Sequence, residues 1–243
     1  MGKIFLVGMG PGDASHMTPA ADEALKAADV ICGYTGYLAL LKDRYPGKDT
    51  FSTPMTREME RCEWAVEAAA AGKTVAMLCS GDSGVYGMAG PVIEKALGTG
   101  VEIEVVPGIT AAVSGAALLG APLMNDFCVI SLSDLMTPWE TIERRLRCAA
   151  QGDFAVALYN PRSHRRRDHL KKACGILMEY KSPETVCGWV RNIGRDGQEA
   201  HLTTLKGLAD ADLDMFCTVF VGTAGTKAAE GFMVTPRGYE EKK

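Results

Sequence analysis

Residues 4–13 read Ile-Phe-Leu-Val-Gly-Met-Gly-Pro-Gly-Asp, an apolar run that leads directly into a glycine-rich loop. The apolar residues predict the first buried strand of an α/β domain. Glycines after a strand let the backbone approach a ligand closely, although a plain strand-to-helix turn would use the same residues. The loop differs from a dinucleotide-binding G-x-G-x-x-G pattern, because Asp13 stands where the third glycine belongs and Pro11 lacks an N–H. We expect the next helix to begin only at Thr18-Pro19, an N-cap followed by a first-turn proline.

The composition limits the possible functions. The chain has 243 residues, 47% of them hydrophobic and 23% charged, and a net charge of −4, which does not favour nucleic acid or an anionic membrane as partner. It contains no apolar run of roughly 18 residues and no signal-peptide pattern, so we expect no membrane span. The eight cysteines form no C-x-x-C pair and the four histidines are scattered. We therefore expect buried reduced thiols, no bound metal and a cytoplasmic location.

The order of the predicted elements indicates the architecture. Strand-like and helix-like segments alternate through the first half, which predicts a parallel sheet covered by helices. A break near residues 120–125 precedes a second set of elements whose last part is rich in strands. We expect an α/β fold with two α/β domains: residues 1–121 with a parallel sheet, and residues 122–243 with a mixed sheet. Two such domains would form a cleft, a common place for a ligand.

Two more loops of small residues follow predicted strands of the first domain. These are Ser80–Gly87, which carries Asp82, and Pro107–Ala111. Open α/β sheets bind ligands at the carboxyl ends of their strands, so the three loops are expected to converge on one site. The alternative is structural, because Asp82, Ser83 or Thr110 would also serve as N-caps of the helices that follow.

A basic cluster, residues 162–167, follows the predicted strand that ends at Tyr159-Asn160-Pro161. Several arginines at a helix N-terminus oppose the helix dipole, so helix energetics do not explain them. They predict either a polyanionic ligand or a solvated basic turn. The chain has neither a G-x-S-x-G elbow nor a G-x-x-x-x-G-K-[ST] loop, which excludes the usual serine hydrolases and P-loop nucleotidases.

Taken in order, these loops resemble the tetrapyrrole (precorrin) methyltransferase family over essentially the whole chain. The resemblance is carried by residues 8–13 with Thr18, and by residues 80–82, 107–111 and 221–222. Position 83 is Ser where the family usually has Pro. A narrower similarity, to the branch that methylates carbon 17 of precorrin-3B or cobalt-precorrin-3 with ring contraction, is carried by residues 33–37, 81–87, 131–139 and 159–163. That branch belongs to cobalamin (corrin) biosynthesis.

The resemblance implies a homodimer with the tetrapyrrole methylase fold, S-adenosylmethionine held between the two domains as methyl donor, and a tetrapyrrole acceptor rich in carboxylates. The residues that it implies for cofactor binding are Gly10, Pro11, Gly81, Asp82, Ser83, Tyr86, Thr110, Ala111, Tyr159 and Asn160. Those that it implies for the acceptor are Arg57, Arg61, Arg162, His164, Arg165, Arg191 and Arg195. Asp82, Ser133 and Asp134 are catalytic candidates for the proton transfers that ring contraction needs, although Ser133-Asp134 would equally start a helix near Trp139.

Three other functions stay open at this point. A methyltransferase for another corrin position would share the same loops. A nicotinamide-dependent oxidoreductase would use the first glycine loop, but Asp13 and the late helix start argue against it. A tetrapyrrole carrier without catalysis would need the arginines and not the donor loops.

Overall fold

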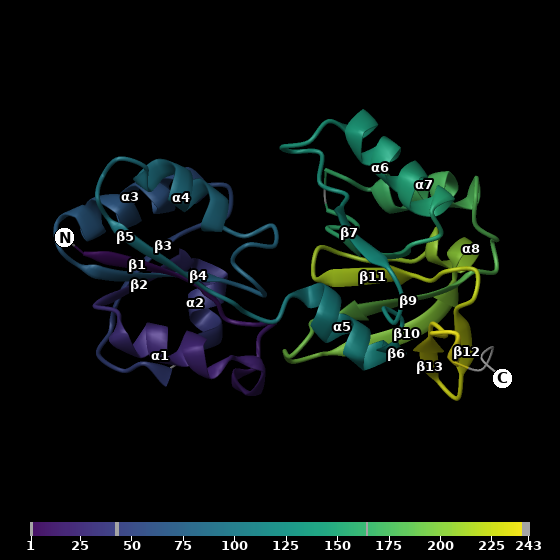
Figure 1. The fold of residues 1–243 in the computed structure, drawn as a ribbon, viewed down its shortest axis with the longest axis horizontal. Helices are drawn as coiled ribbons and strands as arrows, with labels where there is room; N and C mark the ends of the chain where they lie inside the picture. The colour runs from purple at the N-terminus through teal and green to yellow at the C-terminus, as the bar shows by residue number, and fades with distance from the viewer. Residues whose placement is uncertain (1, 42–43, 164, 240–243) are drawn as a thin grey trace. The chain divides into compact units, whose positions relative to one another are not determined.

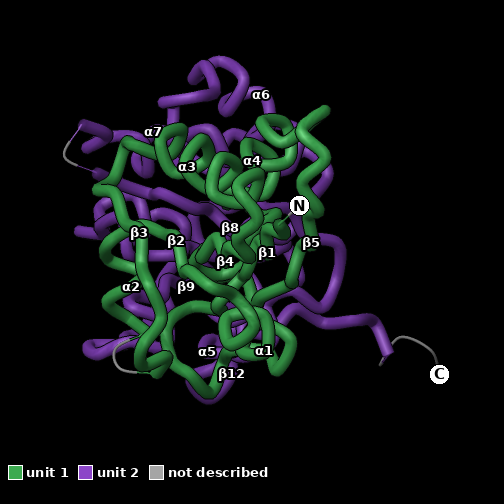
Figure 2. The backbone as a smooth tube through the Cα atoms, turned by 90° about the vertical axis from the view of Figure 1, so that its left-hand side faces the viewer, with its two compact units in different colours: residues 1–111 green, residues 112–243 purple. Residues whose placement is uncertain are grey.

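The computed structural model describes residues 2–41, 44–163 and 165–239 (Figure 1). The chain divides into two compact units, Met1–Ala111 (unit 1) and Ala112–Lys243 (unit 2), which Figure 2 shows in green and purple. None of the described helices is both long and apolar enough to cross a membrane.

Unit 1 is built around a five-stranded parallel sheet. Its strands are β1 (Lys3–Gly8), β2 (Val30–Tyr34), β3 (Asp49–Thr53), β4 (Thr74–Cys79) and β5 (Glu102–Val106), in the order β3-β2-β4-β1-β5. Every pairing in this sheet is parallel, which confirms the predicted architecture. Because β1 lies between β4 and β5, the three glycine loops leave three adjacent strands on the same edge of the sheet.

Helices cover both faces of the unit 1 sheet (Figure 1). They are α1 (Pro19–Ala27), α2 (Thr35–Leu41), α3 (Glu58–Ala70) and α4 (Ala89–Ala96), with a short 3₁₀ turn η1 (Ala14–His16) before α1. Along β1, Ile4 and Leu6 pack with α3 and α4, while Val7 packs with α1. This alternation is the period of two that a strand imposes on its side chains, and it gives the sheet an apolar core on each face.

Unit 2 contains a mixed five-stranded sheet and a small second sheet. The strands β7 (Phe127–Ser131), β8 (Ala155–Tyr159), β9 (Val186–Arg191), β10 (Glu199–Thr204) and β11 (Cys217–Val221) form the order β10-β9-β11-β8-β7. Only β7 and β8 pair in parallel, so the predicted mixed sheet is confirmed. Strands β6 (Gly120–Ala121), β12 (Lys227–Ala229) and β13 (Phe232–Val234) form the second sheet.

Helices α6 (Trp139–Gln151), α7 (His169–Met178) and α8 (Leu205–Leu208) bury one face of the mixed sheet. Helix α5 (Ala111–Leu119) covers the other face, where Gly115 lies close to Val190 and Phe220. Because α5 packs on β9 and β11, the units divide between Ala111 and Ala112, earlier in the chain than the predicted boundary after Ala121.

Candidate active site

The three glycine loops of unit 1 meet, as predicted. Gly10 and Gly81 form a reciprocal pair of backbone hydrogen bonds: Gly10 N donates to Gly81 O over 3.0 Å and Gly81 N donates to Gly10 O over 2.7 Å. The backbone N–H of Gly108 donates to Asp82 Oδ2 over 3.0 Å. The loops after β1, β4 and β5 therefore form one connected surface at the carboxyl edge of the sheet.

Glycine is needed where these loops touch. A Cβ on Gly108 would lie 2.5 Å from the carbonyl carbon and oxygen of Gly8, and closer still to the carbonyl oxygen of Gly81. Gly10 and Gly81 also have φ angles of +79° and +69°, a region that side chains disfavour. The junction is thus a close contact of backbone with backbone, which a side chain on Gly108 would force apart.

The side chains of the second loop hold the junction together. Asp82 Oδ1 accepts from Gly84 N over 2.8 Å while Oδ2 accepts from Gly108 N, so the carboxylate caps its own loop and clamps the neighbouring one. The Ser83 hydroxyl is fully buried and donates to Leu6 O over 3.0 Å. Asp82 is not the N-cap of the next helix, because α4 begins at Ala89 and its N-cap is Met88; its structural role is to tie two loops together. Tyr86, in the same loop, is 58% exposed and has a φ of +54°.

The start of α1 also follows the prediction. Thr18 caps α1 by accepting from Ala21 N over 3.1 Å, and its hydroxyl donates to Pro107 O over 3.2 Å. Asp13 caps the short η1 turn through Ser15 N. The first loop therefore does not run straight into the N-terminus of a long helix, which the dinucleotide-binding pattern requires. This geometry speaks against the oxidoreductase alternative.

A pocket of about 150 Å³ opens beside the junction, at the carboxyl ends of β2, β3 and β4. Arg61 lines it and is itself buried: Nη1 donates to Thr53 Oγ1 over 2.5 Å and to Pro54 O over 3.2 Å. Its guanidinium also lies 3.5 Å from Glu58 Oε1. Tyr34 and Tyr37 line the same pocket and pack edge to face at 5.1 Å. The pocket thus has a fixed cation and aromatic walls.

In unit 2, strands β7, β8 and β9 run in the same direction, since β7 and β8 are parallel and both β8 and β9 are antiparallel to β11. Their last residues, Ser131, Tyr159 and Arg191, therefore lie along one edge of the sheet. Asn160, with φ +55°, donates through Nδ2 to Ser131 Oγ over 2.9 Å. The Tyr159 hydroxyl accepts from Ala112 N, in the first turn of α5, over 2.6 Å.

The segment between β7 and α6 carries an acid–histidine pair. Ser133 N donates to Ser131 Oγ over 3.2 Å, and Asp134 Oδ2 lies 3.0 Å from His169 Nε2. Partial burial opposes ionisation of Asp134, yet the hydrogen bond and charge of His169 hold the pKa of that carboxyl below its ordinary value. The His169 ring packs edge to face on Trp139 at 4.7 Å between ring centroids.

The arginines predicted to bind the acceptor differ in their exposure and in their partners. Arg57 is exposed and pairs with Glu60, and Arg165 is also exposed. Arg195 lies in the turn after β9, where its backbone N–H donates to Asn192 O. Arg162 pairs with the Asp212 carboxylate, and Arg191 donates to the Asp212 carbonyl over 3.1 Å, so Asp212 brings these two together. His164 lies outside the described residues. Among the predicted cofactor-binding residues, Pro11 is buried, and Thr110, just before α5, and Ala111, its first residue, are half-buried.

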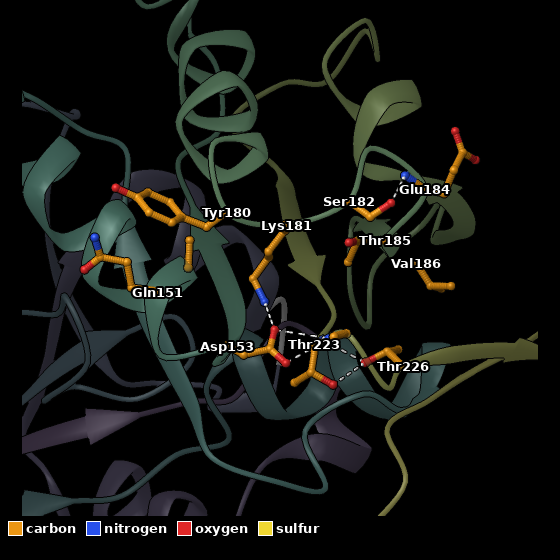
Figure 3. A pocket seen from close by; sticks show the side chains of 12 residues that line it. Gln151, Asp153, Tyr180, Lys181, Ser182, Glu184, Thr185, Val186, Thr223 and Thr226 are labelled. Atoms are coloured by element: carbon orange, nitrogen blue, oxygen red, sulfur yellow. Dashed lines mark hydrogen bonds and ion pairs between the residues drawn. The ribbon is translucent and has the colours of Figure 1, made fainter.

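Sequence reasoning missed two features of unit 2. The first is His169, whose position at the start of a helix gave no sign of its contact with Asp134, 35 residues earlier. The second is a pocket of about 580 Å³ that Asp153, Lys181 and Thr226 help to line (Figure 3). There, buried Lys181 donates to Asp153 Oδ1 over 2.6 Å and to Gly222 O over 3.0 Å. In the part of the chain that the structure describes, no three His, Cys, Asp or Glu side chains gather as a metal site would require.

Comparison with known proteins assigns the class. The model of the tetrapyrrole (corrin/porphyrin) methylase family matches residues 3–209, and the chain belongs to that family. It is 47% identical to a probable cobalt-factor III C(17)-methyltransferase of Salmonella typhimurium, over 97% of this chain and 99% of the relative. It is also 47% identical to the cobalt-factor III methyltransferase of Priestia megaterium, over 99% of this chain but only 46% of that longer relative.

Solved structures agree with this assignment. The methyltransferase CobJ aligns with a TM-score of 0.90 and 38% identity, over 97% of this chain and all of that one. A uroporphyrin-III C-methyltransferase of Thermus thermophilus, in complex with S-adenyl homocysteine, shares the fold with a TM-score of 0.72 and 24% identity, over 91% and 97% of the two chains.

Proposed function

We propose that this chain is an S-adenosylmethionine-dependent methyltransferase that methylates carbon 17 of cobalt-factor III or of precorrin-3B in corrin biosynthesis. The observation that carries the proposal is the 47% identity to the Salmonella typhimurium relative, because it extends over nearly the full length of both chains. Ring contraction and a homodimeric assembly are parts of the same proposal, and they come from the resemblance to that branch of the family.

The junction of unit 1 suits the donor. A Cβ on Gly108 has no room, and Gly81 is buried, whereas Asp82 and Thr110 beside Gly81 are half-buried at the carboxyl edge of the sheet. Backbone N–H and C=O groups bind adenosine and amino-acid groups without a competing side chain. The residues of unit 1 that would hold the donor are Gly10, Pro11, Gly81 and Thr110, with the backbone of Asp82. Bound S-adenosylmethionine supplies a methyl group on a positively charged sulfur.

Methyl transfer requires the protein mainly to position the donor and the acceptor. A nucleophilic ring carbon of the tetrapyrrole forms a bond to the methyl carbon while the carbon–sulfur bond breaks, and the electron pair of that bond stays on sulfur. Since the leaving group comes with the donor, alignment of the two reactants is the main contribution of the chain. Ring contraction adds proton transfers, for which Asp134, held by His169, is a candidate group in unit 2.

The thiols are consistent with work in a reducing compartment. All eight cysteines are free, and most are buried. Burial raises the pKa of the Cys32 thiol to about 12 and that of Cys79 to about 11. Thiols of this kind are poor nucleophiles and serve as packing groups.

A labelled-donor assay tests the proposal. The purified chain is incubated without oxygen with S-adenosylmethionine that carries a ¹³C-methyl group, and with cobalt-factor III or precorrin-3B in parallel. We expect mass spectrometry to show one labelled methyl on the tetrapyrrole in at least one reaction. A chain that binds the donor in calorimetry but labels neither acceptor would contradict the proposed substrate, while stabilisation by a nicotinamide cofactor instead would favour the oxidoreductase alternative.

A further inference from the structure

Arg166 lies in the loop that joins β8 to α7 in unit 2. A turn fixes its backbone, because Arg166 N donates to Ser163 O over 3.1 Å and Ser163 N donates to Arg166 O over 3.3 Å. The loop is tied at its start by the Asn160 bond to Ser131, and just beyond its end by the contact of His169 with Asp134. Arg166 therefore occupies a fixed place at the edge of the sheet where β7 and β8 end.

One N–H group of the Arg166 guanidinium lacks a hydrogen-bond acceptor among the described residues. Its Nε is buried and finds no acceptor among the residues that the structure describes. No carboxylate of those residues lies within ion-pairing distance of the side chain either. The charge of Arg166 contributes to the lowered pKa of Asp134, yet that carboxylate is already bonded to His169. A buried donor on a charged group that lacks an acceptor is costly, and its presence points to an acceptor from outside the chain.

The other arginines proposed for the acceptor differ in this respect. Arg57 lies 2.6 Å from a Glu60 oxygen, and Arg61 is bound to Thr53 and Pro54. The Nε of Arg191 also lacks a hydrogen bond, but it lies 3.3 Å from Asp214 Oδ2, so its charge is compensated. Arg166 combines a buried, unsatisfied N–H with the lack of an acidic partner among the described residues.

We propose that Arg166 binds a side-chain carboxylate of the tetrapyrrole acceptor, at a subsite beside the Asp134–His169 pair. The nature of the ligand rests on the proposed function. A carboxylate supplies two oxygens, so it accepts from Nε and from a terminal nitrogen of the same guanidinium at once. Asp134 is paired with His169 through Oδ2 and forms no ion pair with Arg166. The subsite makes Arg166 a specificity residue that fixes one carboxylate of the macrocycle.

Two substitutions with a matched control test this assignment. Arg166→Met keeps much of the side-chain volume and removes the charge, and Arg166→Lys keeps the charge without the fork. Arg145→Met, on the exposed side of α6, is the control for loss of one positive charge. We measure the KM for the tetrapyrrole, the KM for S-adenosylmethionine, and thermal unfolding of each variant. An equilibrium titration of the same tetrapyrrole, followed by its absorbance, measures binding without turnover.

We expect Arg166→Met to raise the KM and Kd for the tetrapyrrole about 10- to 100-fold, with Arg166→Lys in between and Arg145→Met unchanged. The KM for the donor stays the same, and the melting temperature does not fall, because the removed charge had no partner. Tetrapyrrole binding within twofold of the unmodified chain would overturn the assignment, as would a lower melting temperature with both KM values raised alike. If the unmodified chain binds the tetrapyrrole but methylates none, the proposed function fails, and the titration still decides the role of Arg166.

Discussion

Replacement of Gly108 by alanine probes the glycine junction most sharply. The new Cβ would lie 2.5 Å from two backbone atoms of Gly8, whereas ordinary contacts begin at 3.4 Å, and it would press harder still on the carbonyl oxygen of Gly81. None of these atoms belongs to a flexible side chain, so the strands or loops themselves must move. Gly81 O accepts from Gly10 N, and Gly108 N donates to Asp82, so movement weakens the bonds that join all three loops.

The size of the effect follows from these contacts. Overpacking in a fixed environment costs about 1–3 kcal/mol, and a weakened backbone hydrogen bond adds about 1 kcal/mol. We therefore expect Gly108→Ala to lower the free energy of unfolding by about 2–4 kcal/mol, and to weaken S-adenosylmethionine binding at least about tenfold. Gly175→Ala is the matched control: Gly175 is inside α7 with no atom within 4 Å of its ideal Cβ, so alanine should stabilise the chain by up to about 1 kcal/mol.

Urea unfolding, followed by circular dichroism, and calorimetric titration with the donor measure the two quantities. A Gly108→Ala chain with stability within about 0.5 kcal/mol of the unmodified protein, and with unchanged donor affinity, would refute the close packing of the three loops and their role in binding.

Three further predictions concern single interactions. Hydrogen bonds, first from Lys26 and next from Tyr45, lower the pKa of Asp22 to about 2. The Asp22 carboxylate therefore stabilises the folded state at pH values above its unfolded pKa, and this stabilisation is lost as the pH falls through about 2. The stability deficit of Asp22→Asn in urea should therefore be full at pH 6 and shrink between about pH 4 and pH 2; a deficit independent of pH would contradict it. Lys181→Met leaves Asp153 without its ion pair and should cost about 1–3 kcal/mol in urea unfolding, a loss that would not occur if the pair were dispensable. Tyr159→Phe removes the acceptor for Ala112 N and should cost about 1 kcal/mol, and an unchanged melting temperature would exclude that hydrogen bond.

Much of the fold could be predicted because its central strands are continuous apolar runs. β1 and β4 are buried on both faces, and a run such as Thr74–Cys79 has no other stable place than the middle of a sheet. The edge strand β3 was not predicted, because Asp49–Thr53 is mostly polar and exposed. It is a strand because β2 offers it a row of backbone partners.

The meeting of the three glycine loops could be predicted, but the contacts of the side chains could not. Glycine loops after parallel strands must share an edge, so their convergence follows from topology alone. Asp82 accepts from Gly108, which lies 26 positions further along the chain. Arg162 pairs with Asp212, 50 positions further along. Such partners are set by tertiary packing, which the sequence does not show. For the same reason, the sequence could not single out Arg166, whose Nε is buried without an acceptor among the described residues.

The position of the transferred methyl group tests the central claim most directly. The product formed with ¹³C-labelled S-adenosylmethionine is examined by NMR for the ring carbon that carries the label and for the size of the macrocycle. We predict a single labelled methyl on carbon 17 of a contracted ring. A label on any other ring carbon, or an unchanged tetrapyrrole in the presence of bound donor, would contradict the account.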